Sequence, residues 1–198
     1  MGVVVSPRQA IFAYGSLLSL ASAERTLGRP VEHAALARLP GWRRRWSQAR
    51  DNRRSEKTFA RAEDGAVPPW CLGLNLERGA GPGPNGALLE LSEPELERLD
   101  AREIRYDRLE ITDAIAIEGG RRFTRVFTFV AKPESFAPSP PPGAVILASY
   151  FRAIEAAFEA LGPDQLEVFR ETTGPPPVEV VECVLLLDEI PAGNPRDW

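Results

Sequence analysis

Proline and glycine are so frequent in this chain that loops and short strands are favoured over long helices. The 198 residues include 19 prolines and 16 glycines. Proline removes a backbone donor, and glycine weakens the interior of helices and strands. We therefore expect short strands joined by many loops, with a few flanking helices. This mixture predicts an α+β (mixed) fold around a small closed or barrel-like β-sheet. At this length, one domain over residues 1–198 is expected.

The composition excludes several classes of protein. A hydrophobic content of 43% and a charged content of 26% are those of a globular protein in water. The net charge of −4, with acidic and basic residues mixed, argues against a nucleic-acid partner. No apolar segment is as long as a membrane span, so no membrane partner is expected. Cys71 and Cys183 lie in separate apolar runs and are expected to be free thiols of a cytoplasmic protein.

Turn residues and apolar periodicity predict the secondary structure. Ser92-Glu93-Pro94-Glu95 is a capping box with proline in the first turn, so a helix starts there and ends between Asp100 and Arg102. Glu118-Gly119-Gly120 predicts a hairpin turn between two alternating segments. We expect strands over 3–14, 31–39, 70–76, 87–91, 109–117, 122–130 and 178–187, and helices over 19–27, 92–102, 146–161 and 164–171.

The first candidate functional feature is the turn Tyr14-Gly15-Ser16-Leu17, which follows an apolar strand and precedes a helix beginning near Ser19. Glycine accepts conformations that other residues avoid, so this turn can aim several N–H groups at one point. Consecutive N–H groups at a strand-to-helix turn bind anions. Taken alone, the motif is explained equally well by a tight loop without a ligand.

The second candidate feature is the segment LDAREIRYDR, residues 99–108. Glu103 falls where the predicted helix gives way to a strand, and Tyr106 follows three residues later. Both side chains are therefore placed to enter a cavity. Apolar surroundings raise the pKa of a carboxyl group toward neutrality, which suits a general base. A solvated, charged helix end is the alternative interpretation.

The order and spacing of these motifs resemble the γ-glutamylcyclotransferase-like superfamily. That superfamily includes γ-glutamylcyclotransferase proper, the ChaC-type glutathione-degrading enzymes and the γ-glutamylamine cyclotransferases. The resemblance rests on residues 14–17, on the strand 85–91 and on the pattern LDxRExxYxR over residues 99–108. The segment PGWRRRWSQ, residues 40–48, is also similar to the arginine-rich segment of the ChaC branch.

The resemblance implies an intramolecular acyl transfer that uses no cofactor and no metal. The α-amino group of a γ-glutamyl compound attacks its own γ-carbonyl, which gives 5-oxoproline and releases an amine or amino acid. Glu103 would be the general acid/base. The turn from Tyr14 to Leu17 would hold the glutamyl end through its N–H groups, and Tyr106 would supply an orienting hydroxyl. A single histidine and no Cys/His cluster agree with the absence of a transition-metal site.

Two departures from the superfamily patterns leave the substrate open. The ChaC branch continues into an Arg-Gly-x-Pro stretch, where this chain has RRSEK at residues 53–57. The turn continues with Leu17-Leu18, where γ-glutamylcyclotransferase proper has Asn before Leu. The expected partner is therefore a small γ-glutamyl molecule, namely glutathione, a γ-glutamyl dipeptide or a γ-glutamylamine. The motifs are compatible with a monomer or a homodimer.

Several residues and functions have competing interpretations. Arg43, Arg44 and Arg45 are expected to be exposed, with contact to a substrate carboxylate as the alternative. His33 is expected to be structural, and Trp42 to lie in the core or at its rim. Two other functions fit the same motifs. One is a protein that binds γ-glutamyl ligands without turnover, and the other is a hydrolase that uses Glu103 to activate water.

Overall fold

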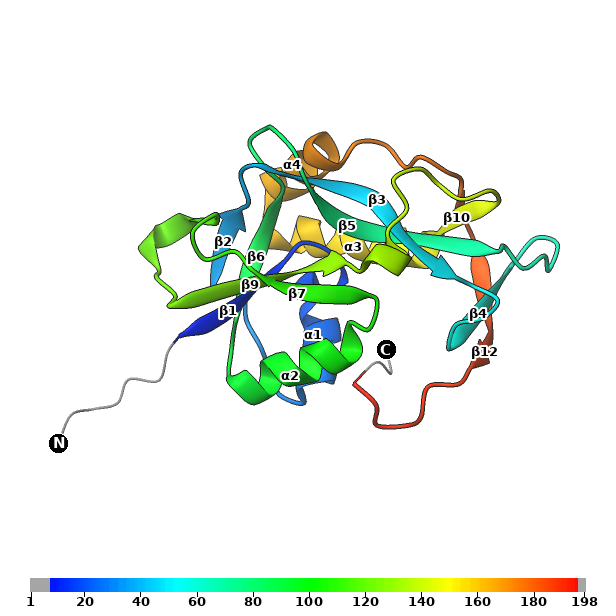
Figure 1. Ribbon diagram of the computed structural model, residues 1–198, viewed down its shortest axis with the longest axis horizontal. Helices are drawn as coiled ribbons and strands as arrows, with labels where there is room; N and C mark the ends of the chain where they lie inside the picture. Colours follow the sequence, from blue (N-terminus) through cyan, green and yellow to red (C-terminus); the bar gives the residue numbers. More distant parts are fainter. Residues whose placement is uncertain (1–7, 196–198) are drawn as a thin grey trace.

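A six-stranded sheet forms one side of the molecule in the computed structural model, which describes residues 8–195. Its strand order is β7-β9-β1-β6-β2-β8 (Figure 1). Every residue of β1 is buried, because β1 pairs antiparallel with β6 and parallel with β9. The bounds are β1 Gln9–Ala13, β2 Ala35–Arg38, β6 Asn85–Leu91, β7 Tyr106–Glu110, β8 Ala116–Ile117 and β9 Arg125–Ala131.

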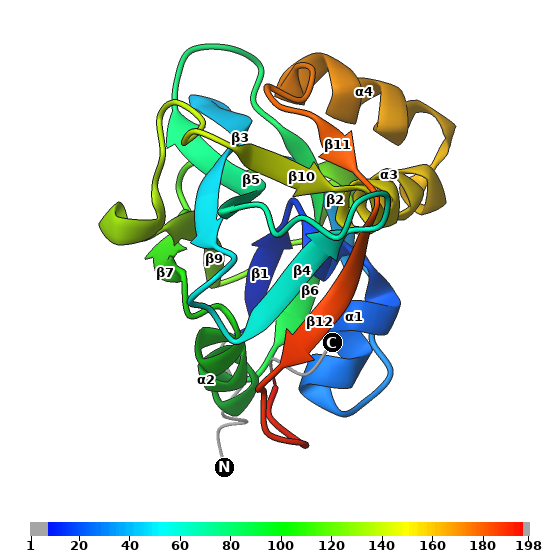
Figure 2. The same cartoon turned by 90° about the vertical axis from the view of Figure 1, so that its right-hand side faces the viewer.

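Two smaller sheets account for the other strands of residues 8–195. The four-stranded sheet has the order β11-β10-β5-β3, and β4 pairs with β12 in a separate ribbon. In the view of Figure 2 this ribbon lies in front of β1 and β6. Side chains join β5 to the six-stranded sheet, since the Asn75 Oδ1 atom accepts the Ala131 N–H at 2.8 Å. The bounds are β3 Trp42–Asp51, β4 Lys57–Arg61, β5 Trp70–Arg78, β10 Ala144–Leu147, β11 Val180–Val181 and β12 Cys183–Asp188.

The four α-helices of the described part of the chain pack in two pairs, α1 with α2 and α3 with α4. The Ser19 hydroxyl caps α1, and Gly28 ends it with a left-handed φ of 72°, which favours glycine. The predicted capping box at Ser92 and Glu95 is present at the start of α2. No helix of the described chain has the length and apolarity that crossing a membrane requires. The bounds are α1 Leu20–Leu27, α2 Glu93–Arg102, α3 Ala148–Leu161 and α4 Pro163–Thr173.

The predicted α+β class with a few flanking helices is confirmed. Over residues 8–195 the strands form three sheets and no closed barrel. The physical reason is that β5 meets the end of β9 through the side chain of Asn75 and not through a ladder of backbone bonds. The first part of the predicted strand 3–14 lies outside the described residues.

Two predicted elements are wrong. The hairpin at residues 118–120 is replaced by direct pairing of β7 with β9, while β8 pairs with β2. The chain turns at Ile111, whose carbonyl accepts the N–H groups of Ala114 and Ile115, and this turn carries β8 away from β9. Ile146 belongs to β10 and not to α3, because its N–H donates to the Glu179 carbonyl at 2.9 Å.

The expected exposure of the three arginines holds for Arg43 and Arg45 and is wrong for Arg44, which is only 1% exposed. Successive side chains of a strand point to opposite faces, so β3 directs Arg44 into the core and its two neighbours outward. The guanidinium carbon lies 4.6 Å from the ring centroids of both Phe158 and Phe169. These contacts bring α3 and α4 onto β3.

The Arg44 guanidinium has five hydrogen-bond partners, all of them neutral oxygens. It donates to the Tyr14 carbonyl at 3.2 Å and to the Asn85 carbonyl and Oδ1 atom at 2.8 Å each. It also donates to the hydroxyls of Thr172 at 3.2 Å and Thr173 at 2.8 Å. Burial lowers the pKa of Arg44 to about 9, so the group is charged at neutral pH.

We expect Arg44→Met to lower the free energy of unfolding by about 3–5 kcal/mol, because it leaves several buried carbonyl and hydroxyl oxygens without donors. Arg43→Met is the matched control on the exposed face of β3 and should change the free energy by less than about 0.5 kcal/mol. Urea titration monitored by circular dichroism measures both values. Equal losses in the two variants would contradict the structural role assigned to Arg44.

Candidate active site

A cavity of about 430 Å³ lies between α1, α3, β5, the β4–β12 ribbon and the segment joining α2 to β7. A recess of about 30 Å³, which has room for about two water molecules, adjoins it. The two spaces share four lining residues, Ser16, Glu103, Tyr106 and Tyr150. The site is therefore a wide chamber with a narrow polar end.

The recess brings together every residue that the sequence motifs select as a candidate site residue. These residues are Tyr14, Gly15, Ser16, Leu17, Glu103 and Tyr106. The two motifs lie far apart in the sequence and meet because β1 ends beside the junction of α2 and β7. The tertiary structure thus places the predicted turn directly against the predicted carboxylate.

The turn after β1 is a short 3-10 helix, Ser16–Leu18, with Gly15 as its N-terminal flank. The Gly15 carbonyl accepts the Leu18 N–H at 2.9 Å. The first N–H groups of a helix have no partner within it, and none of the hydrogen bonds within residues 8–195 uses those of Ser16 and Leu17. These two donors are available to an anion or a carbonyl oxygen of a ligand.

Glu103 is the residue that ends α2, and its side chain is 15% exposed. Burial raises the pKa of this carboxyl group, and the nearby guanidinium groups of Arg102 and Arg105 oppose the rise. The Arg102 Nε atom lies 3.1 Å from the Glu103 Oε1 atom. A carboxyl group with a raised pKa is a stronger base than an exposed one when it is ionised, and a ready acid when it is protonated.

Arg102 fixes Glu103 by binding to the neighbouring helix. Its Nη1 atom donates to the Ser22 carbonyl at 3.2 Å and to the Thr26 hydroxyl at 2.6 Å, and its Nη2 atom donates to the Ser22 hydroxyl at 2.9 Å. Ser22 and Thr26 are one turn apart on α1. The packing of α1 on α2 is therefore part of the apparatus that positions the carboxylate.

Three tyrosines line the recess, Tyr14 buried and Tyr106 and Tyr150 half-buried, and each hydroxyl is hydrogen-bonded to the backbone. Tyr14 donates to the Phe129 carbonyl, and Tyr106 to the Leu74 carbonyl, both at 2.8 Å. Tyr150 accepts the Leu74 N–H at 3.3 Å. Burial raises the pKa of all three phenols, that of Tyr150 to about 12, so they stay protonated at neutral pH. Their oxygens can accept hydrogen bonds from a bound ammonium group.

Sequence reasoning missed Tyr150 and Gln48 among the polar residues that line the cavity. Tyr150 belongs to the apolar stripe of α3, but its hydroxyl requires a partner when it is buried. Gln48 belongs to the segment that resembles the ChaC branch, in which the arginines are the more prominent residues. A polar residue on an otherwise apolar face of a predicted element is the sequence feature that could have indicated Tyr150 or Gln48.

The other candidate residues have structural roles. The His33 Nε2 atom lies 3.0 Å from the Leu18 carbonyl, as expected for a structural histidine. Trp42 is buried, also as expected. Cys71 and Cys183 are free thiols. Within residues 8–195, no group of three or more His, Cys, Asp or Glu side chains could hold a metal ion.

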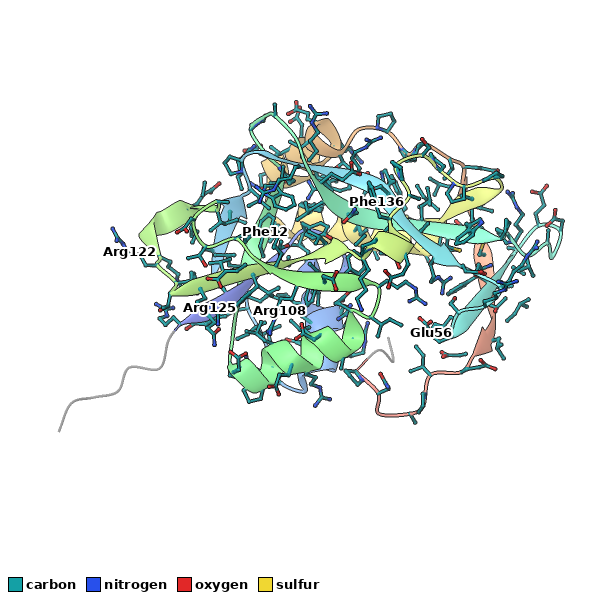
Figure 3. The ribbon with its side chains drawn as sticks, in the orientation of Figure 1. Phe12, Glu56, Arg108, Arg122, Arg125 and Phe136 are labelled. Carbon is teal, nitrogen blue, oxygen red and sulfur yellow. The ribbon has the colours of Figure 1, made fainter. Side chains whose placement is uncertain are left out.

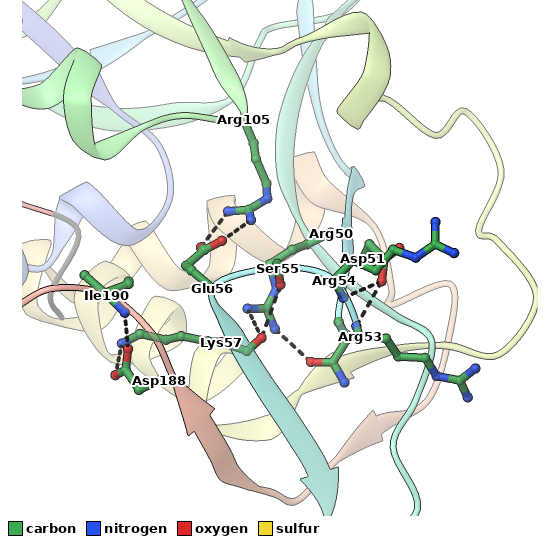
Figure 4. A network of polar contacts seen from close by, with 11 residues as sticks. Arg50, Asp51, Arg53, Arg54, Ser55, Glu56, Lys57, Arg105, Asp188 and Ile190 are labelled. Carbon is green, nitrogen blue, oxygen red and sulfur yellow. Dashed lines mark hydrogen bonds and ion pairs between the residues drawn. The ribbon is translucent and has the colours of Figure 1, made fainter.

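An ion pair attaches the start of the β4–β12 ribbon to the rest of the cavity wall, and another joins its two strands (Figure 4). Glu56 accepts two hydrogen bonds from Arg105, at 2.9 and 2.5 Å, just before β4 begins. The Lys57 Nζ atom lies 3.1 Å from Asp188 at the end of β12. Burial by itself raises the pKa of Glu56, but the hydrogen bonds and charge of Arg105 lower it to about 2.

Comparison with solved structures identifies the fold, although no protein-family model and no curated protein sequence matches the chain. YkqA from Bacillus subtilis matches with a TM-score of 0.52 and 18% identity over 84% of this chain, which spans only 54% of YkqA. A protein described as γ-glutamyl cyclotransferase matches with a TM-score of 0.53 and 16% identity, over 87% of this chain and 93% of that one.

A γ-glutamyl cyclotransferase from yeast, described as specific to glutathione, matches with a TM-score of 0.52 and 14% identity. The match covers 85% of this chain and 98% of the yeast chain. These likenesses show that the chain has the γ-glutamylcyclotransferase-like fold, which is the fold that the resemblance of its motifs implies.

We expect Glu56→Gln to lower the free energy of unfolding at pH 6 by about 1 kcal/mol, allowing for solvent screening. Because the folded-state pKa of Glu56 is about 2 against an ordinary value of 4.5, its stabilisation is complete above pH 4.5. The stabilisation is then lost as the pH falls toward 2. Urea titrations between pH 3 and 6 should therefore show that the free energies of unfolding of wild type and Glu56→Gln approach each other as the pH falls.

The exposed Glu110–Arg125 ion pair provides the control for this experiment. Arg125 lies at the opposite end of the molecule from Glu56 (Figure 3). Glu110→Gln should cause a much smaller change, because water screens an exposed pair. If the free energies of unfolding of wild type and Glu56→Gln differed by the same amount at every pH, the lowered pKa of Glu56 would not be a source of stability.

Proposed function

We propose that this chain, which has the γ-glutamylcyclotransferase-like fold, is a cyclotransferase that releases 5-oxoproline from a γ-glutamyl compound. The observation that carries the proposal is the Glu103 carboxylate, which is only 15% exposed and lines both the recess and the wide cavity. A substrate that spans the two spaces passes this carboxylate. The reaction needs one group that accepts and returns a proton, and Glu103 has the burial and raised pKa that suit this role.

The proposed reaction moves protons from the attacking nitrogen to the leaving nitrogen through Glu103. Glu103 takes a proton from the α-ammonium group of the substrate, and the free amine then attacks the γ-carbonyl carbon. A C–N bond forms to close the five-membered ring, and the bond from the same carbon to the leaving nitrogen breaks as protonated Glu103 returns its proton to that nitrogen. The re-ionised Glu103 then takes the extra proton of the ring nitrogen and passes it to the released amine, which leaves as an ammonium ion. Attack within one molecule requires a folded-back substrate, so positioning supplies much of the acceleration.

The recess suits the charged end of a glutamyl group. The N–H groups of Ser16 and Leu17 can hold a carboxylate or steady negative charge on the carbonyl oxygen during attack. The hydroxyl oxygens of Tyr106 and Tyr150 can accept hydrogen bonds from the ammonium group before it is deprotonated. The wide cavity then receives the leaving group.

The decisive experiment incubates the protein with glutathione, γ-glutamyl-alanine and γ-glutamyl-ε-lysine and assays 5-oxoproline. We expect product from at least one of them, and a loss of about 10²–10⁴-fold in rate for Glu103→Gln. Glu97→Gln, an exposed change on the same helix, should leave the rate unchanged. Full activity of Glu103→Gln, or no product from any substrate, would overturn the proposal.

Product analysis separates the competing functions. A hydrolase would release free glutamate, which carries a primary amine, whereas 5-oxoproline carries none. A protein that binds without turnover would show heat of binding by calorimetry and neither product. Each outcome therefore points to one of the three functions that the motifs allow.

A graded pair of substitutions at Gly15 tests the role of the recess. A Cβ atom at Gly15 would lie 3.8 Å from Leu74 Cδ1 and 3.9 Å from the Tyr150 hydroxyl, which are ordinary contacts. We expect Gly15→Ala to fold and bind, and Gly15→Val to weaken binding of γ-glutamyl-alanine at least about tenfold because its added methyl groups fill the recess.

Calorimetry in the Glu103→Gln background measures this binding without turnover. Both Gly15 variants add a Cβ atom, so their difference isolates the filling of the recess, and thermal unfolding verifies that both are folded. Equal affinities of the Ala and Val variants would show that the glutamyl end binds elsewhere.

A further inference from the structure

Gln48 carries a buried amide that the fold leaves incompletely bonded. Its residue is 6% exposed, and its Nε2 atom makes no hydrogen bond within residues 8–195. Gln48 also lines the wide cavity. An unpaired buried amide donor is unfavourable, because it has lost its hydrogen bonds to water, so an arrangement of this kind is explained when a ligand supplies the acceptor.

The β-sheet makes room for this amide beside the tyrosines. The β3–β5 register shifts between Arg45 and Gln48, and Gly73 is the residue of β5 opposite Gln48. A Cβ atom on Gly73 would lie 2.7 Å from the Gln48 Oε1 atom, 3.5 Å from the Tyr106 hydroxyl and 3.7 Å from the Tyr150 hydroxyl. The absence of a side chain at Gly73 therefore lets three polar groups converge on one point.

Gln48 lies on the wide side of the catalytic carboxylate. Tyr106 and Tyr150 line both the recess and the wide cavity, whereas Gln48 lines the wide cavity and not the recess. If the glutamyl end occupies the recess, the amide of Gln48 faces the part of the substrate just beyond the scissile bond. That part is the leaving group.

The charge of the wide cavity favours an anionic leaving group. Its lining includes five basic residues and two acidic ones, Arg25, Arg50, Lys57, Arg102 and Arg105 against Glu56 and Glu103. Glu56 and Glu103 are already engaged by Arg105 and Arg102. Within the described chain, Arg25 makes no ion pair with a carboxylate, and the hydrogen bonds of Arg50 go to two neutral oxygens, both at 3.1 Å.

We infer that Gln48 is a specificity-determining residue that donates a hydrogen bond to a carboxylate or peptide carbonyl oxygen of the leaving group. An α-amino acid or peptide carries such an oxygen on the carbon two bonds from the scissile nitrogen, and a simple amine has none. The substrate class is therefore γ-glutamyl amino acids and peptides, in preference to γ-glutamylamines. This inference rests on the proposed cyclotransferase function.

A matched pair of substrates tests it. γ-Glutamyl-alanine and γ-glutamyl-ethylamide differ only in the carboxylate of the leaving group. We expect wild type to prefer γ-glutamyl-alanine at least about tenfold in kcat/KM, because a site built to bond an oxygen discriminates against the analogue that lacks it. Gln48→Met should lower kcat/KM for γ-glutamyl-alanine about tenfold and change that for the ethylamide less than about twofold.

Two further variants complete the design. Gln9→Met makes the same chemical change at an equally buried glutamine, 6% exposed, that does not line the cavity, so it should leave the preference unchanged. Gln48→Glu keeps the shape of the side chain and replaces the donor by a carboxylate, so it should lower the preference at least as far as Gln48→Met. It also provides the measurement if Gln48→Met does not fold.

The outcomes distinguish this inference from the proposed function. Equal kcat/KM values of wild type for the two substrates, or an equal loss for both in the Gln48 variants, would overturn the inference and leave the cyclotransferase function standing. No 5-oxoproline from either of these substrates, from glutathione or from γ-glutamyl-ε-lysine would overturn the function itself. A loss confined to γ-glutamyl-alanine in the Gln48 variants would support the role of Gln48 in choosing the leaving group.

Discussion

The buried guanidinium of Arg44 is the interaction on which the rest of this structure depends. Within residues 8–195, none of its hydrogen-bond partners is a carboxylate, so its charge is balanced by oxygens of the turn after β1, of β6 and of the end of α4. The C-terminal end of a helix carries partial negative charge, which makes α4 a suitable partner. A buried charge of this kind is tolerable only when all of these elements are in place. The same guanidinium therefore holds the core together and fixes the Tyr14 carbonyl beside the recess.

A second buried arginine, Arg102, links the packing of two helices to the position of Glu103. Arg102 binds α1 through Ser22 and Thr26 and forms an ion pair with Glu103, so the position of the carboxylate depends on the packing of two helices. In the proposed complex, the glutamyl end of the substrate would lie in the recess and its leaving group in the wide cavity, on either side of this carboxylate. Backbone groups and tyrosines line the recess, whereas Gln48 and an excess of basic side chains line the wide cavity.

Local rules predicted a large part of the fold and of the recess. Ser92, Glu95 and Gly28 act through hydrogen bonds and backbone preferences within a few residues of themselves, so the ends of α1 and α2 could be read from the sequence. The same reasoning placed Glu103 at the end of α2. It failed for β8, because the turn at Ile111 directs this segment to a distant strand, and for Ile146, whose pairing partners lie on other strands.

The sequence by itself determined the α+β class, the turn from Tyr14 to Leu17 and the placement of Glu103 and Tyr106 at an element boundary, because these features depend on neighbours along the chain. Only the tertiary structure decided that the turn and the carboxylate share one recess and that Tyr150 and Gln48 join them. It also decided that Arg44 is buried while Arg43 and Arg45 face solvent. The physical reason is that burial and hydrogen-bond partners are set by contacts between segments far apart in sequence. The local sequence around an arginine or a glutamine therefore does not show whether its side chain is buried or exposed.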